Sequence, residues 1–554
     1  MKQKDKKISQ KIIFLLFSTF FLVGLFTFKD YGISVDEEFN RISGLYWLNY
    51  ILSFTSFDEL KNVVGVKLNE INDFTLGPAL EVVANHSYYG VVFDLPLAFI
   101  EVIFKINDSQ QYFYLRHLLT FILFFISAIF FYKLLLNRFL NYNIALIGTL
   151  FFVLSPRIYG HSFFNNKDII FLSLIAIALY FCFKSLEKLS YKNLFIFAIF
   201  AALATAQRIL GIFLPISFIF FYLLTVLSNN KNLKSSPNII FFIFFYFLFS
   251  ILFWPVLWSN PLEKFFLAFQ YFSYHYLHMQ MLFKGSYIYS NFLPYDYILT
   301  WALISTPILY VTLFIVGYIL IFKRFFIRFI NIKYNTHYYD LWRGYNEKKD
   351  LFILFNFTFI IFYLATSEIV LYTGWRQVYF INIFIIYIAV FAFYQIDLNL
   401  KLRSIKKPQF IIVSLCLVFI VYKMIVYHPY QNIYFNNFFN KNAHEKFEVD
   451  YWGLTGKKFL EYILFLEKNK NLIKIGTASF LPLERSTKLL SEKDRKKISI
   501  VGQNFQDADY LYTNFISEVD KNSNDKYKIP NNFSKIDEFI LNSTIVYQVF
   551  KKNN

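Results

Sequence analysis

The residues with the clearest chemical potential follow the first apolar run of the chain, which ends at Phe28. Four carboxylates stand within nine residues soon after that run: Asp30, Asp36, Glu37 and Glu38. A carboxylate held at a membrane surface is partly desolvated, and desolvation raises its pKa toward that of a useful general base. The alternative interpretation is a solvated loop, because loops are normally polar.

A second group of polar side chains recurs at the ends of later apolar runs. It comprises Arg157, His161, Lys167 and Asp168 in one loop, then Arg208, and then Trp375 and Arg376. The planar guanidinium of an arginine binds phosphate oxygens through two parallel hydrogen bonds, so these arginines suit a lipid phosphate. Arg and Lys also anchor helix ends by snorkelling, and for the loop from Ser155 to Asp168 this alternative stands beside ligand binding.

These residues must be positioned by membrane-spanning helices. Of 554 residues, 57% are hydrophobic and 17% are charged, and the mean hydropathy is +0.43, which excludes an ordinary soluble domain. A spanning helix needs roughly 20 mostly apolar residues. About eleven such runs are present: Lys11–Phe28, Leu115–Leu136, Asn143–Leu154, Asp168–Phe183, Leu194–Ala206, Ile209–Leu227, Ile239–Leu257, Ile298–Phe322, Leu351–Thr366, Val378–Tyr394 and Phe410–Tyr427. The stretch from Leu194 to Leu227 also reads as one kinked span.

The basic residues alternate between successive loops. Clusters stand at residues 2–11, 133–138, 184–192, 231–234, 323–349 and 401–407. Cytoplasmic loops of membrane proteins collect Lys and Arg, so we expect these clusters and the N-terminus on the cytoplasmic side of an inner cell membrane. The loop of residues 29–114 and the tail from His428 then lie on the outer face. The net charge of +18 is distributed in this loop pattern, so we expect the lipid bilayer as a partner and no nucleic acid.

The last part of the chain has a different composition. Residues 441–554 alternate polar stretches with short apolar patches that predict strands, at Ile473–Ile475, Ile498–Val501, Tyr510–Tyr512 and Thr544–Phe550, and a helix at Lys457–Lys468. We therefore expect a small α/β domain outside the cytoplasm, attached to a membrane domain of residues 1–440. No His, Cys or carboxylate cluster has metal-ligand spacing, so no bound metal or cofactor is predicted.

The order of these segments resembles the GT-C polyprenyl-phosphate-sugar glycosyltransferases, in particular the protein-mannosyltransferase-like bacterial members. Those enzymes have a first span, an acidic pair in a large outer loop, a surface helix with a Pro-Leu element, and then many spans. Here Asp36-Glu37 matches the acidic pair and Asp94-Leu95-Pro96-Leu97 is similar to the later element, although a single proline replaces the usual two. Further similar segments cover the membrane domain: Asn165–Phe171, Trp254–Leu262, Gly374–Arg376 and His428–Asn436.

The resemblance implies an all-α polytopic membrane protein that transfers a sugar from a polyprenyl phosphate to a lipid, glycan or protein acceptor on the outer face, by an inverting displacement. It implies that Asp36 is the general base and that Glu37 orients it or binds substrate; Asp168 is the next candidate for the base. Substrate binding is expected from Asp94, Arg157, His161, Lys167, Asp168, Arg208, Trp375 and Arg376. The alternative is a transporter or lipid flippase for an anionic substrate, although such proteins tend to have internal repeats and midplane charges, which this sequence lacks.

Overall fold

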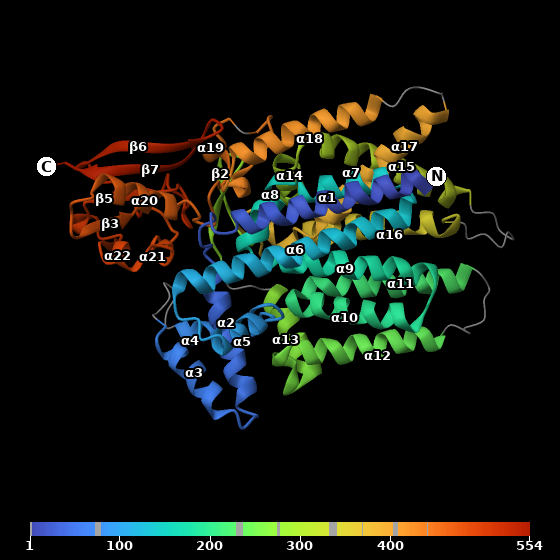
Figure 1. Cartoon of the computed structure of the whole chain (residues 1–554), viewed down its shortest axis with the longest axis horizontal. Helices are drawn as coiled ribbons and strands as arrows, with labels where there is room; N and C mark the ends of the chain where they lie inside the picture. Colours follow the sequence, from blue (N-terminus) through green and yellow to red (C-terminus); the bar gives the residue numbers. More distant parts are fainter. Residues whose placement is uncertain are drawn as a thin grey trace.

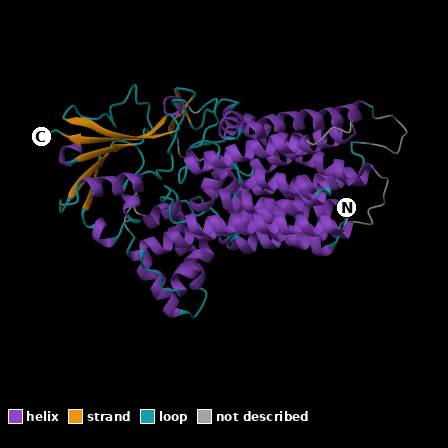
Figure 2. Ribbon diagram, turned by 45° about the horizontal axis from the view of Figure 1, so that its top comes forward, coloured by secondary structure: helices purple, strands orange, loops and turns teal. Residues whose placement is uncertain are grey.

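The structure is a computed structural model, and it describes residues 3–71, 79–228, 236–273, 278–331, 341–367, 369–402, 408–439 and 441–553. Long helices form a bundle that occupies most of the molecule (Figure 1). A small helical lobe and a domain with a β-sheet both lie at the end of the bundle that is opposite the N-terminus (Figures 1 and 2). The two segments predicted on one face of the membrane, residues 29–114 and the tail, therefore share one end of the molecule.

The bundle contains the predicted apolar runs. Its elements are α1 (Gln3–Thr27), α6 (Ser109–Phe139), α7 (Tyr142–Val153), α8 (Pro156–Phe164), α9 (Asp168–Glu187), α10 (Tyr191–Gln207), η1 (Ile209–Ile212), α11 (Phe213–Ser228), α12 (Ser236–Phe253), α14 (Tyr297–Ser305), α15 (Ile308–Ile330), α16 (Gly344–Thr366), α17 (Ile381–Leu402) and α18 (Pro408–Val426). By length and composition, eight helices among the described residues can cross a membrane, and the pair α7 and α8 makes a ninth if it is one bent span. The shorter apolar helices α10 and α12 account for the two remaining predicted runs. The prediction of a polytopic helical membrane protein is confirmed.

Prolines explain two breaks in the bundle. Pro156 occupies the first turn of α8, and the axis bends by 62° between α7 and α8. Pro307 precedes α15, and Thr306 before it is extended, because the residue before a proline disfavours the helical conformation. The predicted run Ile298–Phe322 is therefore not one helix but two, α14 and α15.

Arg208 separates α10 from η1 and α11. Its backbone is extended, and Gly211 then lies so close to α10 that an added Cβ would be 2.6 Å from the carbonyl carbon of Ala204. The stretch from Leu194 to Leu227 thus forms two elements that run separately along the bundle, and not one kinked span (Figure 1).

The helical lobe follows the first span. It consists of α2 (Glu37–Leu52), α3 (Asp58–Asn69), α4 (Ala79–Asn85) and α5 (Asp94–Ile103). Helices α2 and α5 cross at Gly44, where an added Cβ would lie 2.3 Å from the carbonyl oxygen of Asp94. The same end of the bundle holds η2 (Pro255–Trp258), α13 (Pro261–Ser273), a hairpin of β1 (Gln280–Phe283) and β2 (Ser286–Tyr289), η3 (Arg376–Val378) and η4 (Gln431–Ile433).

The C-terminal domain is built around a five-stranded sheet of order β4-β3-β5-β7-β6. Strand β3 pairs in parallel with β4 and β5, whereas β7 is antiparallel to β5 and β6. Its elements are α19 (Ala443–Lys446), α20 (Gly456–Leu466), β3 (Ile473–Thr477), α21 (Glu484–Thr487), α22 (Glu492–Arg495), β4 (Ile498–Gly502), η5 (Phe505–Asp507), β5 (Tyr510–Thr513), β6 (Phe533–Leu541) and β7 (Thr544–Lys552). The four predicted strands and the predicted helix are confirmed, and β6 is an additional edge strand. The division of the chain at residue 440 stays a prediction.

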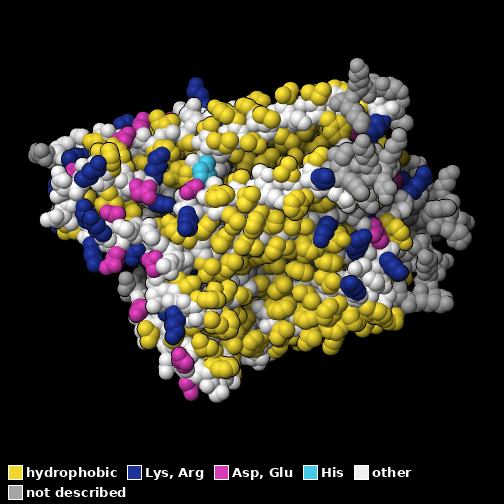
Figure 3. All heavy atoms as spheres, viewed as in Figure 1, with side chains coloured by type: hydrophobic (Ala, Val, Ile, Leu, Met, Phe, Trp, Pro, Cys, Tyr) yellow, Lys and Arg dark blue, Asp and Glu magenta, His cyan; other side chains and the backbone are white. Residues whose placement is uncertain are grey.

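The surface of the bundle is apolar between two charged ends. Figure 3 shows hydrophobic side chains covering its length, with most charged groups on the sheet domain, on the lobe and at the opposite end. Exposed aromatic and aliphatic residues on α12 and α18, such as Phe244 and Ile411, are 60% and 66% exposed, as expected for lipid-facing helices. The basic residues Lys231, Lys234, Arg403, Lys406 and Lys407 lie outside the described residues, and the sidedness of the protein stays a prediction.

The close crossing of α2 and α5 can be tested by adding one methyl group. We predict that Gly44→Ala destabilises the protein by roughly 1–3 kcal/mol, because a buried methyl without space forces the two helices apart. Gly65→Ala in α3 is the matched control: its Cβ meets nothing within 4 Å, so that variant should be neutral or more stable by up to about 1 kcal/mol. Thermal unfolding in detergent measures both, and equal midpoints for Gly44→Ala and the wild type would contradict the crossing.

Candidate functional site

A cavity of about 860 Å³ lies at the end of the bundle where the lobe and the C-terminal domain meet it. Its walls come from α2, from the loops that begin α9 and η1, from α11 and α13, from the segment before η3, and from residues 480–485 and 516–526 of the C-terminal domain. This volume falls within the range of ligand sites in proteins. The cavity is therefore the candidate functional site.

Asp36 and Arg376 meet at the wall of this cavity. Asp36 is the residue before α2, but its carboxylate makes no capping hydrogen bond to that helix and instead pairs with the guanidinium of Arg376. The side chain of Asp36 is 36% exposed, whereas that of Arg376 is 5% exposed. The guanidinium of Arg376 also lies over the rings of Tyr372 and Trp452, at 4.9 and 4.6 Å from their centroids. Burial lowers the pKa of Arg376, but Asp36, Tyr372 and Asp168 together raise it by more, so the net shift of this pKa is upward and the cation is retained.

Arg208 and Lys167 also line this cavity. Arg208 pairs with Asp168, which also accepts a hydrogen bond of 2.9 Å from the side-chain amide of Asn165. The ammonium of Lys167 donates to the carbonyl of Gly90 and lies 5.2 Å from the centroid of the Tyr89 ring. Burial lowers the pKa of Lys167 to about 8. Lys167 is therefore a cation that titrates close to physiological pH.

Another part of the cavity wall is apolar. It is formed by Phe213 and Ile216 of α11 and by the side chains of α13 that line the cavity: Phe265, Phe266, Phe269 and Phe272. Ile216 and Phe266 are 51% and 70% exposed, so this wall continues to the outside of the bundle. The cavity thus joins a cluster of charged groups to an apolar surface that a lipid chain can contact.

Glu37 and Asp94 lie behind the cavity wall. The carboxylate of Glu37 is fully buried, accepts a hydrogen bond of 2.7 Å from the backbone N–H of Ser34, and lies 3.0 Å from Nε2 of His117. Asp94 is fully buried and pairs with Arg116. Burial raises the pKa of Asp94, against the opposing effect of Arg116. Both carboxylates hold neighbouring segments in place and do not reach the cavity.

Arg157, His161 and Trp375 form a second layer beneath the site. His161 Nε2 lies 3.0 Å from the hydroxyl of Tyr379, which lies 3.1 Å from the hydroxyl of Tyr451, a residue of the cavity wall. Arg157 is 1% exposed and donates to the same Tyr451 hydroxyl at 3.4 Å. The indole N–H of Trp375 donates to Ser305 at 2.9 Å. These residues support the wall, and four of the predicted residues contribute to it directly: Asp36, Lys167, Arg208 and Arg376.

Several lining residues were not predicted from the sequence. Arg485 reaches the cavity from the C-terminal domain, and Tyr89, Tyr372, Gln377 and Tyr451 also line it. Only Gln377 had a sequence signal, since it directly follows the segment Gly374–Arg376 that resembles the family. Arg485 stands in a polar stretch of the tail without a motif, so no local pattern marks it.

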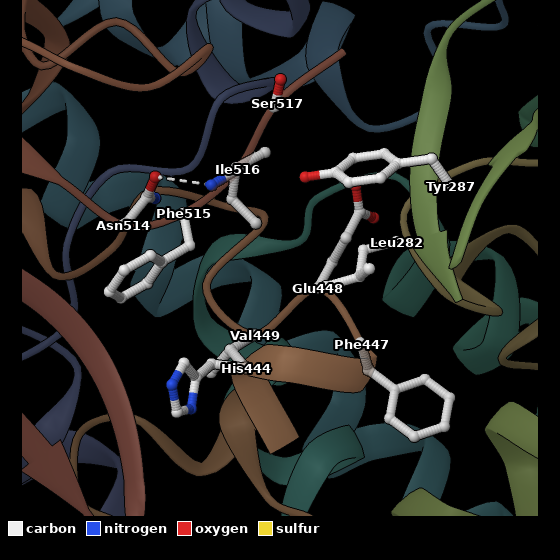
Figure 4. A pocket seen from close by; sticks show the side chains of 10 residues that line it. All are labelled: Leu282, Tyr287, His444, Phe447, Glu448, Val449, Asn514, Phe515, Ile516 and Ser517. Atoms are coloured by element: carbon white, nitrogen blue, oxygen red, sulfur yellow. Dashed lines mark hydrogen bonds between the residues drawn. The ribbon is translucent and has the colours of Figure 1, made fainter. Parts of the chain in front are cut away.

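A second cavity lies between the β1–β2 hairpin and the start of the C-terminal domain (Figure 4). Figure 4 shows the carboxyl of Glu448 beside the ring of Tyr287, with Asn514 and His444 nearby. Glu448 is 4% exposed and one of its carboxyl oxygens has no hydrogen-bond partner, and burial raises its pKa to about 8. The space is about 10 Å³, which accommodates at most one water molecule. This cavity is too small for a substrate.

Within the described ranges, no group of three or more His, Cys, Asp or Glu side chains could hold a metal ion. The predicted absence of a tightly bound metal stays a prediction.

Comparison with known proteins agrees with the predicted resemblance. Residues 95–258 match the family described as dolichyl-phosphate-mannose-protein mannosyltransferase. The prediction of a membrane glycosyltransferase is confirmed. The matched segment contains Lys167, Asp168 and Arg208 but neither Asp36 nor Arg376. No protein with a curated description matches the sequence significantly.

Solved structures of other proteins are similar to this chain, among them the following two. One is ArnT from Cupriavidus metallidurans bound to undecaprenyl phosphate, with 11% sequence identity, a TM-score of 0.47 and coverage of 97% of each chain. The other is the oligosaccharyltransferase of Archaeoglobus fulgidus in the apo form, with 12% identity and a TM-score of 0.42 over 76% of this chain and 57% of that chain.

Proposed function

We propose that this glycosyltransferase moves a hexose or pentose from a polyprenyl-phosphate carrier, undecaprenyl phosphate in a bacterium, to an acceptor at the outer face of the inner membrane. The observation that carries the proposal is the composition of the cavity. A carboxylate and three cations, Asp36, Lys167, Arg208 and Arg376, share one space with an apolar wall that reaches the outside of the bundle. A lipid-linked sugar phosphate requires this combination.

The lipid tail and the phosphate of the donor differ in polarity, so each binds a different part of the cavity. The isoprenoid chain lies along α11 and α13, where Phe266 and Ile216 are exposed on the surface of the protein. The phosphate lies against Lys167, Arg208 and Arg376, since cations that already face the leaving group stabilise the negative charge that develops on it. Substrate binding and leaving-group stabilisation thus use the same side chains.

Asp36 is the general base in this proposal. The acceptor hydroxyl attacks the anomeric carbon while Asp36 takes its proton; the new bond joins the acceptor oxygen to the sugar, and the bond between the sugar and the phosphate oxygen breaks. A single displacement inverts the anomeric configuration. Before the donor binds, Arg376 pairs with Asp36. A phosphate that shares the guanidinium weakens this pair and releases the carboxylate to accept a hydrogen bond from the acceptor hydroxyl.

The remaining candidates fit the cavity less well. Asp168 is 1% exposed and its two carboxylate oxygens are engaged by Arg208 and Asn165, which makes it a poor base in this arrangement. Glu37 acts through the Ser34 backbone that it holds. A transporter for an anion would need charged groups along the middle of the bundle, whereas these cations gather at one end.

Replacing Asp36 tests the assignment of the base. We predict that Asp36→Asn binds the donor but loses transfer by about 10²–10⁴-fold, because a positioned base contributes that much to such a step. Asp30→Asn is the control: Asp30 is a neighbouring acid whose carboxylate lies 2.8 Å from His428 near the surface, and its replacement should be mild. Transfer of labelled sugar from polyprenyl phosphates in proteoliposomes measures both variants. Near wild-type turnover by Asp36→Asn would place the base elsewhere.

Lys167 predicts the pH dependence of donor use. Because its pKa is lowered to about 8, the free enzyme carries this cation below pH 8 and loses it as the pH rises through that value. We therefore expect kcat/KM for the donor to fall above about pH 8, since this parameter reports groups of the free enzyme. Lys167→Arg keeps its charge at all these pH values and should abolish that fall. The exposed Lys493→Arg serves as control, and a wild-type profile that is flat from pH 7 to 9.5 would contradict the role of Lys167.

A further inference from the structure

The turn that carries Asp36 is anchored on one side to the membrane domain. The carboxylate of Glu37 accepts a hydrogen bond of 2.7 Å from the backbone N–H of Ser34, and the hydroxyl of Ser34 donates a hydrogen bond of 3.3 Å to the carbonyl of Phe164. These contacts fix the beginning and the buried face of the turn, but they leave the backbone of Val35, the residue directly before Asp36, to other partners.

The C-terminal domain supplies those partners. The N–H of Val35 donates to the carbonyl of Trp452 at 3.2 Å, and the carbonyl of Val35 accepts a hydrogen bond from the guanidinium of Arg485. Both backbone groups of Val35 are therefore held by residues more than 400 positions away in the chain. The position of Asp36 depends on a domain that the membrane helices do not contain.

Further contacts join the same two regions. Glu38 pairs with Lys488 and lies 3.7 Å from Nε of Arg485. At Gly32, an added Cβ would lie 2.4 Å from the carbonyl oxygen of Leu454, so the two backbones meet directly. Arg485 is the residue that combines these features, because it contacts the turn on both sides of Asp36 and also lines the cavity.

We propose that Arg485 is a positioning residue: it holds the turn from Val35 to Glu38 so that the Asp36 carboxylate faces the cavity, which makes the C-terminal domain part of the catalytic unit. This inference rests on the proposed role of Asp36 as the base. The domain then serves the reaction itself, and a chain without it would bind the lipid donor but transfer sugar poorly.

Variants of Arg485 separate positioning from substrate binding. Arg485→Ala should lower kcat by about 10–100-fold per folded molecule while the KM for the donor stays within about twofold, since a base displaced by about 1 Å loses up to about 10²-fold. Arg485→Lys, which can still donate to the Val35 carbonyl, should recover part of the loss. Lys488→Ala should have a smaller effect, because Lys488 contacts only Glu38 in this turn. The exposed Lys493→Ala of the same domain is the matched control and should behave as wild type.

The full-length protein in proteoliposomes is assayed beside Asp36→Asn, with folded enzyme counted from its size-exclusion peak. Loss of kcat in Arg485→Ala with partial rescue by lysine supports positioning. A raised donor KM with unchanged kcat would overturn the proposal, because Arg485 would then bind the donor. An unchanged kcat per folded molecule together with a lower unfolding temperature would also overturn it, because the role of Arg485 would then be purely structural. If Asp36→Asn is active, the proposed base is wrong; if Asp36→Asn is inactive and Arg485→Ala is active, only the positioning role fails.

Discussion

Buried charge at one end of an apolar bundle is the constraint on which the rest of this structure depends. Burying a charged group costs free energy because the group loses its hydration. Pairing with an opposite charge and hydrogen bonding must offset this cost. Here each pair joins different elements of the fold: Asp36 with Arg376, Asp168 with Arg208, and Asp94 with Arg116. The Asp36–Arg376 pair spans 340 residues, so the loop before α2 and the segment before α17 must be brought together for the buried charge of Arg376 to be offset.

The same principle operates at the opposite end of the bundle. Asp350 is fully buried and accepts hydrogen bonds from Arg138 and Arg324 and, at 2.8 Å, from the hydroxyl of Tyr387. This network ties α6, α15, α16 and α17 together. The contrast explains why one cluster is a candidate site and the other is an anchor: Asp36 keeps 36% of its side chain exposed to the cavity, whereas the side chain of Asp350 has no exposure.

The sequence predicted the helices well because a span is a local signal, readable from one apolar run. It also pointed to Asp36, Lys167, Arg208 and Arg376, which line the cavity, because each is a charged residue close to the end of an apolar run. The sequence did not predict that the side chain of Glu37 points away from the cavity. Adjacent residues at the start of a helix point in directions about 100° apart, so Asp36 and Glu37 face different surroundings. Strand β6 was missed because its charged residues, such as Lys535 and Glu538, suit an exposed edge strand and hide the apolar pattern. Arg485 contacts the turn before α2 only through tertiary interactions, such as the one with the Val35 carbonyl 450 positions away. The residues next to Arg485 in the sequence form no motif that marks this contact.

The most direct test of the account is the structure of the full-length protein in a lipid nanodisc with a saturating polyprenyl phosphate. The account predicts that the phosphate occupies the cavity within hydrogen-bond distance of Arg208 or Arg376, with the isoprenoid chain along α11 and α13. A cavity that stays empty at saturation, or a phosphate bound at another surface of the bundle, would contradict it.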